Sequence, residues 1–473
     1  SEKFPCDVTL YVENKIMGAF FDEGFIVTNL PYIKEEISFY NSYKKEPVNL
    51  AVAGAIAKTG IQEASFVNEV KRKHNFFFSD ETKRGEITNQ KKSGRCWMFS
   101  SLNAARVNVM EKCNMETFEL SQNYTLFWDK LEKSNYFLES ILETLDEPLN
   151  GRLLAHLLSN PVQDGGQWDM FAGLLKKYGV VPKDVMPETF HSSDTGAMVT
   201  ELTHRLRKYA HLLRSGHAEG KSVDALRKQK EEYLKDIYSF LVKALGEVPE
   251  VFDFEYKDKD KKFHKVEKLT PQQFFKDFVG WNLDEKISLI NAPTKDKPYG
   301  NAYTVKFLGT VKEAEPIHYI NVPIDVLKKA AIASIKAGQP VWFGCDMGPY
   351  ISRKDGIMDM DVYAYEKTIG ELPTFTKEER LDYGDSLLTH AMVLTGVDLD
   401  SKGNPIKWQV ENSWGDEVGQ KGIFSMSDEW FDEYTYQIMV EKKFVEKKWL
   451  DALKKPLVEL EPWDPMGALA LMK

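Results

Sequence analysis

The stretch that decides the fold is QKKSGRCWMF, residues 90–99, in which a cysteine stands between a Ser-Gly turn and an apolar run. Gly94 permits the tight turn, and residues 97–110 have the composition of a helix that begins beside Cys96. The unpaired N–H groups and the dipole at a helix N-terminus favour negative charge, and the thiolate is the nucleophilic form of cysteine. The stretch therefore predicts a cysteine placed for nucleophilic attack.

Gln90 precedes this cysteine by six residues and carries a side-chain amide N–H. Together with the backbone N–H of Cys96, it is a candidate donor to the oxyanion that forms when the cysteine attacks a carbonyl. The competing interpretation is a buried structural cysteine at a helix start, which is the ordinary role of an intracellular cysteine. The stretch alone leaves both interpretations open, because a catalytic cysteine also needs a base.

Composition limits the protein class. The 473 residues are 42% hydrophobic and carry a net charge of −10, so no global basic field favours nucleic acid or anionic lipid. The four cysteines are scattered, without a pair or a Cys/His spacing that suits zinc, and we expect no metal or cofactor. No apolar run approaches the roughly 18 residues of a membrane span, and the first residues lack a signal-peptide pattern. We expect a soluble, cytosolic protein.

The first half of the chain has helical patterns. Residues 48–59 predict a helix that ends at Gly60, and Ser121 is a plausible N-cap for a helix through Leu131. Residues 200–246 predict a pair of helices that packs within the chain or between subunits, with a break at residues 216–220.

Two other features of this half concern its turns and loops. The paired glycines Gly165 and Gly166 permit close approach of another backbone, although a tight turn is the simpler interpretation. Residues 257–262 mix Lys and Asp, which predicts a solvated loop.

From about residue 300 the period changes to the alternation of strands, which predicts a sheet after a mainly helical region. A helix is expected over residues 324–337, and residues 350–384 are irregular. The expected strands, of which the last three look antiparallel, are 303–308, 317–322, 341–345, 390–397, 408–415 and 422–426.

His390 is the candidate base. It begins one apolar run, and Asn412 stands on the next run 22 residues later, so adjacent antiparallel strands bring the two side chains together. The imidazole takes the thiol proton and later donates it to the leaving amine, while an amide oxygen on the other ring nitrogen orients the ring. Trp414 is placed to cover the Asn–His hydrogen bond from water. For His390 alone, a satisfied core histidine is the competing interpretation.

The order Gln, Cys, His and Asn-Ser-Trp-Gly resembles that of the papain-like cysteine peptidases. The spacing of 294 residues between Cys96 and His390 exceeds the roughly 130–150 of the compact enzymes, which fits an insertion near residues 200–290. The closer resemblance is to the bleomycin hydrolase and aminopeptidase C family, across all but about the first 45 residues. The phrases that carry it are SGRCWMF, ELSQNY, DGGQWDM, YGVVPK, NVPIDVLK, PVWFGCDMG, THAMVLTGV, KWQVENSWG, MSDEWFDEY and WDPMGALA.

The resemblance implies an α+β, papain-like two-lobed fold, with a helical lobe and an antiparallel β-barrel lobe, assembled as a homohexamer around an inner channel. Gly165 and Gly166 then correspond to the wall that binds the substrate backbone on the unprimed side. The implied division is an N-terminal hook region over 1–75, a helical catalytic lobe over 76–200, a helical insertion over 201–295, a β-barrel lobe over 296–450 and a C-terminal arm over 451–473.

The C-terminal segment has its own physical interpretation. Pro462 and Pro465 stiffen an extended chain, and the small residues that follow fit a narrow groove. In the family, a terminal carboxylate in the cleft pairs with the free ammonium of a peptide and makes the enzyme an aminopeptidase. The family ending corresponds to Ala470, a candidate substrate-binding residue, and we hypothesise that the enzyme trims residues 471–473. A disordered tail is the alternative.

The sequence thus predicts a cytosolic thiol aminopeptidase that acts on peptides with a free N-terminus. Cys96 is the expected nucleophile, His390 the base and acid, and Asn412 its orienting partner, with Gln90 as oxyanion donor. One alternative is a hexameric assembly that binds nucleic acid, which the acidic net charge disfavours. The other is an endopeptidase, if the tail is displaced from the cleft.

Overall fold

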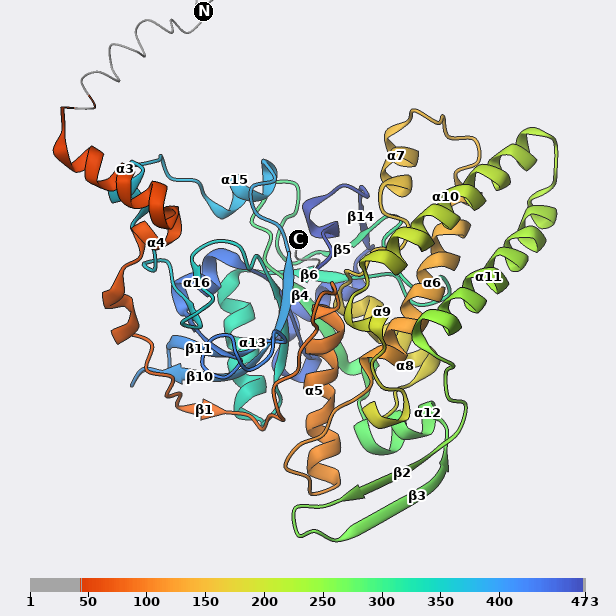
Figure 1. Ribbon diagram of the computed structural model, residues 1–473, viewed down its shortest axis with the longest axis horizontal. Coiled ribbons are helices and arrows are strands. Elements are labelled where there is room, and N and C mark those ends of the chain that lie inside the picture. Colours follow the sequence, from red (N-terminus) through yellow and green to blue (C-terminus); the bar gives the residue numbers. More distant parts are fainter. Residues whose placement is uncertain (1–42, 44, 471–473) are drawn as a thin grey trace, which may run out of the picture. The chain divides into compact units, whose positions relative to one another are not determined.

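The computed structural model describes residue 43 and residues 45–470, which form two compact units (Figure 1). One unit consists of the described residues up to Phe66 together with residues 364–371. The other contains residues 67–363 and 372–470. The expectations for residues 1–42, the first part of the predicted hook region, and for the trimmed tail over 471–473 lie outside the described residues.

The smaller unit contains helices α3 (Pro47–Thr59), α4 (Ile61–Ser65) and α14 (Tyr365–Thr368). Gly60 ends α3 with φ of 87° and donates its N–H to Ile56 O, so the prediction of a helix that ends at this glycine is confirmed. The hydroxyls of Ser65 and Thr368 lie 2.6 Å apart and join α4 to α14.

The larger unit begins with a helical half, built around α5 (Cys96–Lys112). Nearly every side chain from Cys96 to Met110 is buried, because α5 packs on helices on one side and on the sheet on the other. The prediction of a helix after the Ser-Gly turn is confirmed. The other helices of this half are α6 (Gln122–Glu143), α7 (Arg152–Ser159), α8 (Trp168–Tyr178), α9 (Phe190–Ser193), α10 (Gly196–Ala218) and α11 (Val223–Leu245).

Local signals account for several of these helix ends. Ser121 Oγ accepts the N–H of Tyr124 at 3.0 Å, so the predicted N-cap of α6 is confirmed, although the helix runs on to Glu143. The predicted pair of helices is confirmed as α10 and α11, which pack on each other and on α6.

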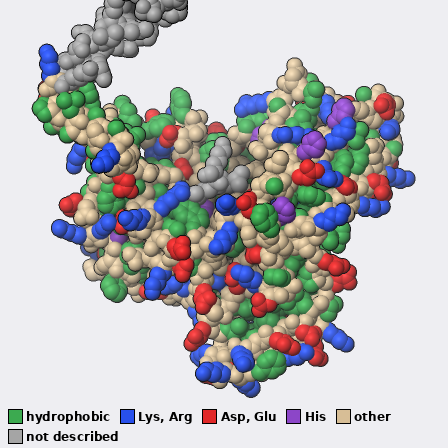
Figure 2. Space-filling view, in the orientation of Figure 1, with side chains coloured by type: hydrophobic (Ala, Val, Ile, Leu, Met, Phe, Trp, Pro, Cys, Tyr) green, Lys and Arg blue, Asp and Glu red, His purple; other side chains and the backbone are tan. Residues whose placement is uncertain are grey.

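A β-hairpin that the sequence analysis did not anticipate follows α11. Strands β2 (Phe252–Lys257) and β3 (Phe263–Leu269) flank the mixed Lys/Asp run, so the exposed loop predicted there is the hairpin turn. The short helical segments α12 (Pro271–Phe274), η3 (Phe275–Val279) and η4 (Leu283–Glu285) then lead to the main sheet. On the face in Figure 2, basic and acidic side chains are interspersed over this hairpin.

The second half of the larger unit is a sheet with the strand order β14-β5-β6-β4-β13-β7-β10-β11-β12-β9-β8, and β1 (Asp80–Glu81) adds to β10. The pairs of β10 with β11 and of β11 with β12 are antiparallel, as predicted, and β10 also pairs antiparallel with β7. The pairs β14–β5, β4–β6 and β12–β9 are parallel instead. The strands are β4 (Lys286–Ile290), β5 (Ala302–Val305), β6 (Tyr319–Asn321), β7 (Val341–Cys345), β8 (Ile351–Ser352), β9 (Ile357–Met358), β10 (His390–Leu399), β11 (Pro405–Glu411), β12 (Ile423–Ser427), β13 (Thr435–Glu441) and β14 (Val458–Leu460).

Helices also pack against this sheet. The predicted helix over 324–337 is α13 (Ile324–Lys336), which contacts β13 and β10. Further helices are α15 (Lys377–Asp382), α16 (Asp428–Tyr434) and α17 (Lys447–Leu450). Among the described residues, no helix combines the length and the apolar character needed to cross a membrane.

A buried ion pair ties the helical half to the sheet. Arg106 of α5 lies 2.8 Å from Glu411 at the end of β11, and the two side chains are 1% and 2% exposed. Arg106 also donates to Glu86 O at 2.7 Å. Removing one partner of such a pair leaves the other charge buried and unpaired.

We therefore expect Arg106→Met to lower the free energy of unfolding by about 3–5 kcal/mol, measured by urea denaturation. Lys235→Met is the matched control, because Lys235 pairs with Glu232 at the surface with 71% and 69% exposure. The control should change the free energy of unfolding by about 0.5 kcal/mol or less. Equal effects of the two substitutions would contradict a structural role for the buried pair.

Candidate active site

Cys96 is the first residue of α5 and is fully buried. Backbone N–H groups of Cys96, Trp97 and Ala391 hydrogen-bond its sulfur and favour the thiolate, but burial dominates and raises the pKa of the thiol to about 12. Ala391 follows His390 at the start of β10, so its contact brings the helix start and the histidine strand together. The local arrangement is the one predicted for a nucleophile at a helix N-terminus.

His390 and Asn412 also meet, as the strand pattern predicts. His390 Nε2 lies 2.9 Å from Asn412 Oδ1, which also accepts the N–H of Ser413 at 2.8 Å. Asn412 stands just past the end of β11. The Trp414 ring lies 4.9 Å from the imidazole centroid, and the Arg353 guanidinium lies over its ring. Trp414 therefore packs against the imidazole, which is the position that the predicted cover needs.

The other imidazole nitrogen, Nδ1, is buried and has no hydrogen-bond partner in the part of the chain that the structure describes. Burial lowers the pKa of His390 to about 4, against the opposing effect of the Asn412 hydrogen bond. Both the thiol and the imidazole are thus neutral in this closed arrangement, because little water reaches either group. The free nitrogen is the one that can exchange a proton with a reacting group.

Gln90 is held between the two halves of the larger unit. Its Oε1 accepts the hydroxyl of Ser413 at 2.7 Å, and its backbone N–H donates to Ser413 O at 2.8 Å. Its Nε2 donates to Ser93 O at 2.7 Å, which leaves one amide hydrogen for another acceptor. Gln90 therefore joins the turn before the cysteine to the segment that carries Asn412.

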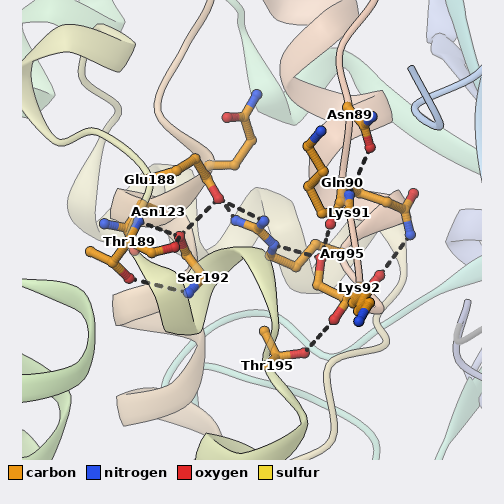
Figure 3. Close-up of polar contacts among 12 residues, drawn as sticks. Asn89, Gln90, Lys91, Lys92, Arg95, Asn123, Glu188, Thr189, Ser192 and Thr195 are labelled. Carbon is orange, nitrogen blue, oxygen red and sulfur yellow. Dashed lines mark hydrogen bonds and ion pairs between the residues drawn. The ribbon is translucent and has the colours of Figure 1, made fainter. Parts of the chain in front are cut away.

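An arginine that the sequence analysis did not single out anchors the same turn (Figure 3). Arg95, which is fully buried, binds both oxygens of Glu188, at 3.0 and 2.8 Å. Burial opposes ionisation of Glu188, but the Arg95 hydrogen bonds and charge hold its pKa below the ordinary value. The sequence carries no signal for this pairing, because the partners lie 93 residues apart.

The two glycines of the predicted wall have different contacts. Gly166 O accepts the N–H of Ala470 at 3.3 Å, and a Cβ at Gly166 would lie 2.5 Å from Cε2 of Trp97. Gly165 O instead accepts from Lys133 of α6 at 2.7 Å. Only glycine at position 166 therefore lets the wall approach the tryptophan beside Cys96.

The C-terminal segment lies along this wall. Ala470 O is 3.3 Å from Cys96 Sγ, and Gln167 Nε2 donates to Ala468 O at 2.7 Å and to Met466 O at 3.0 Å. Upstream, Asp464 is 2.9 Å from Lys297, with side chains 9% and 2% exposed. The Trp463 ring packs under the Arg152 guanidinium at 3.9 Å. The segment up to Ala470 is therefore bound within the site.

Two hollows adjoin these groups. A cavity of about 220 Å³ lies beside the C-terminal segment, and its walls include Phe137, Leu157, Met170 and Leu469. A second, of about 330 Å³, is lined by residues 90–94, 194–196 and 414. Among the described residues, no group of three or more His, Cys, Asp or Glu side chains is arranged to hold a metal ion.

A model of the Peptidase C1-like family matches residues 33–467. The chain belongs to this family. Aminopeptidase C of Listeria monocytogenes is 48% identical over 434 residues, covering 92% of this chain and 98% of the relative. Bleomycin hydrolase of Gallus gallus is 44% identical over 391 residues, covering 81% of this chain and 86% of the relative. The predicted relationship to these proteins is confirmed.

A solved structure of this C1-like type has the same fold. The crystal structure of PepW from Lactobacillus rhamnosis HN001 matches with a TM-score of 0.91 and 47% identity, over 93% of this chain and 99% of that chain. The expectation of a papain-like α+β fold is therefore confirmed. Because relatives named aminopeptidase C match at this identity and coverage, we conclude that the chain is a cysteine-type aminopeptidase and therefore a hydrolase.

The contact between Gly166 and Trp97 generates a prediction. Gly166→Ala should lower kcat/KM for a peptide substrate by about 10²-fold, because the added methyl displaces a wall that lies beside Cys96. Gly54→Ala is the matched control, since a Cβ at Gly54 in α3 meets nothing within 4 Å. The control should keep full activity; a Gly166→Ala enzyme with unchanged kcat/KM would show that the wall does not guide the substrate.

Proposed function

We propose that this aminopeptidase removes N-terminal residues from peptides through Cys96, His390 and Asn412, with the C-terminal arm restricting the cleft. The observation that carries the proposal is the 3.3 Å contact of Ala470 O with Cys96 Sγ, beside the Ala470 N–H bond to Gly166. A main chain bound through Gly166 with a carbonyl at the sulfur has the pose that a scissile peptide needs. The arm thus supports both the position of attack and the limit on how far a substrate extends.

The proposed reaction begins when His390 Nδ1 takes the proton of Cys96. The sulfur bonds to the substrate carbonyl carbon, and the resulting oxyanion accepts hydrogen bonds from Gln90 Nε2 and the Cys96 N–H. Protonated His390 then gives its proton to the departing amine as the C–N bond breaks. The shortened peptide leaves, and the N-terminal residue stays as a thioester.

The second half of the cycle regenerates the enzyme. His390 removes a proton from water, the hydroxide adds to the thioester carbonyl, and the C–S bond breaks. The amino acid leaves as its carboxylate once the second proton of the water has passed to solvent, and the proton on His390 returns to the sulfur. Asn412 keeps Nε2 engaged at 2.9 Å throughout, so that Nδ1 stays directed to the reacting atoms. The hollow bounded by Gln90 and Trp414 is suited to the departing peptide.

Location and assembly belong to the same proposal. We assign residues 1–75 to a hook, 76–200 and 296–450 to the two lobes, 201–295 to an insertion and 451–473 to the arm. The enzyme is proposed to act in the cytosol as a homohexamer. The nucleic-acid alternative gains no support from the hairpin, where Lys265 lies within 3.2 Å of carboxylates of Asp253, Glu255 and Glu267.

The central test compares one fluorogenic peptide bearing a free amine with its N-acetylated twin. Wild-type enzyme should cleave the free-amine form only, and Cys96→Ala should cleave neither. Cys113→Ala, which alters another buried free cysteine, is the matched control and should keep activity. Equal cleavage of both peptides would identify an endopeptidase, and activity in Cys96→Ala would remove the thiol mechanism.

A second test loosens the arm through its ion pair. Asp464→Ala removes the partner of Lys297 and the acceptor that caps Met466 N–H. Because the arm then binds the cleft more weakly, cleavage of the N-acetylated peptide should rise at least about tenfold. A tenfold rise corresponds to a loss of about 1.4 kcal/mol in the free energy of arm binding. Asp451→Ala is the control, since Asp451 pairs with Lys454 at the surface.

The same variants test the burial of the thiol. Burial raises the pKa of Cys96 to about 12, so water that enters after arm displacement must lower it and increase the thiolate fraction at any lower pH. The pH profile of alkylation by iodoacetamide should therefore shift to lower pH in Asp464→Ala and stay in place in Asp451→Ala. An unchanged profile in Asp464→Ala would mean that the arm does not control access of water.

A further inference from the structure

Asp164, the residue before the glycine pair, contacts both backbone segments that border Cys96. Its Oδ2 accepts the N–H of Gly94 at 3.0 Å and the hydroxyl of Thr195. Its backbone carbonyl accepts Trp97 Nε1–H at 2.7 Å. The whole residue Asp164 is 5% exposed, and it belongs to the turn that continues into Gly166. One residue thus connects the turn before the cysteine, the cysteine helix and the substrate wall.

Two lysines of α6 balance this carboxylate and hold the same loop. Lys130 Nζ is 2.7 Å from Asp164 Oδ1 and donates to Gln163 O at 3.0 Å. Lys133 Nζ is 3.0 Å from Asp129 and donates to Gly165 O at 2.7 Å. The four charged side chains are between 0% and 6% exposed. They form a neutral, nearly dry cluster beneath the site.

Stability alone does not account for such a cluster. Removing four charges from water costs several kcal/mol per ion, and apolar side chains of similar volume commonly give equal or greater stability. Charged groups differ from apolar ones in that they orient particular dipoles. Here the dipoles are backbone groups of the two loops that border Cys96.

The peptide unit between Ser93 and Gly94 is held at both ends. In a trans peptide the C=O and N–H point in opposite directions. The N–H of Gly94 donates to Asp164, and the Ser93 carbonyl accepts Gln90 Nε2 at 2.7 Å. The orientation of the Gln90 amide therefore depends on a peptide plane that Asp164 fixes.

The wall is oriented in the same way. Lys133 binds the carbonyl of Gly165, and the N–H of the same peptide unit belongs to Gly166. That N–H points away from Lys133, and the next carbonyl, Gly166 O, accepts the arm at Ala470. The charged cluster, through Lys133, thus sets the direction of the Gly166 N–H.

We infer that Asp164, supported by Lys130, is a positioning residue that aligns the oxyanion donor Gln90, beside a wall that Lys133 orients; this inference rests on the proposed function. Although burial opposes its charge, the ion pair with Lys130 and the bonds from Thr195 and Gly94 hold the pKa of Asp164 well below the ordinary value. The carboxylate therefore stays a full acceptor at neutral pH.

The test separates amide hydrolysis from simple thiol reactivity in the full chain. Hydrolysis of the free-amine peptide passes through an oxyanion, whereas alkylation of Cys96 by iodoacetamide does not. Asp164→Asn removes the negative charge and places a donor near Lys130. We expect kcat to fall by about 10²-fold, the usual cost of losing one oxyanion donor. The alkylation rate at a fixed pH should not fall, because the Asp164 charge raises the pKa of Cys96 and its loss favours the thiolate.

A double-variant comparison tests the route through Gln90. If Asp164 acts by orienting that amide, Gln90→Ala with Asp164→Asn should have the kcat of Gln90→Ala alone. Additive losses, a parallel fall of alkylation and hydrolysis, or an unchanged kcat in Asp164→Asn would each overturn the inference. Asp146→Asn, at an aspartate side chain that is 97% exposed, is the matched control and should behave as wild type.

A milder variant decides the matter if Asp164→Asn does not fold. Thr195→Val keeps the shape of the side chain and removes the hydroxyl bond to Asp164. It should lower kcat several-fold without changing alkylation, and equal changes in both would count against the inference. Failure of the proposed function itself is recognised separately, because wild-type enzyme would then keep its activity after complete alkylation of Cys96.

Discussion

The structure depends on keeping the Cys96 thiol in a place that excludes water. Cys96 is fully buried at the start of α5, and burial alone favours the neutral thiol over the thiolate. The backbone N–H groups of Cys96, Trp97 and Ala391 oppose that effect in part. A helix start supplies the first two donors, and the strand that begins at His390 supplies the third. The site can therefore exist only where a helix end and a strand end meet.

That meeting is maintained by polar contacts between segments that are far apart in the chain. Arg95 is fixed by Glu188, and Gly94 by Asp164. Gln90 reaches Ser413, which lies beside the asparagine that binds His390. The buried pair of Arg106 and Glu411 joins the same helix to the same sheet. Because unpaired buried charges are costly, these pairs restrict how the two halves of the larger unit fit together.

The C-terminal arm adds a second restriction on the same space. It is held at Trp463 by Arg152, at Asp464 by Lys297 and along its backbone by Gln167. Its last described residue, Ala470, is fully buried against Cys96. The arm therefore contributes to the dryness that keeps the thiol and the imidazole neutral. Water access and the protonation of Cys96 and His390 are linked through this one segment.

The sequence by itself determined the local elements and the family resemblance. Short-range signals are sufficient for a helix after Gly94, an N-cap at Ser121, a helix end at Gly60 and alternating strands near His390, because each depends on neighbours a few residues away. The hairpin β2–β3 was not anticipated, since its strands are rich in charged residues and many of their side chains are exposed. The parallel pairs in the sheet were also missed, because strand order is set by packing between distant segments.

Only the tertiary structure decided how the site is held. The sequence brought Gln90, Cys96, His390, Asn412 and the glycine pair forward as candidates, because residue type and order carry that information. It gave no sign that Gly165 faces Lys133 whereas Gly166 faces the arm, or that Arg95 and Asp164 hold the turn. These contacts join residues tens to hundreds of positions apart, and the low dielectric that makes them strong exists only once the chain has excluded water.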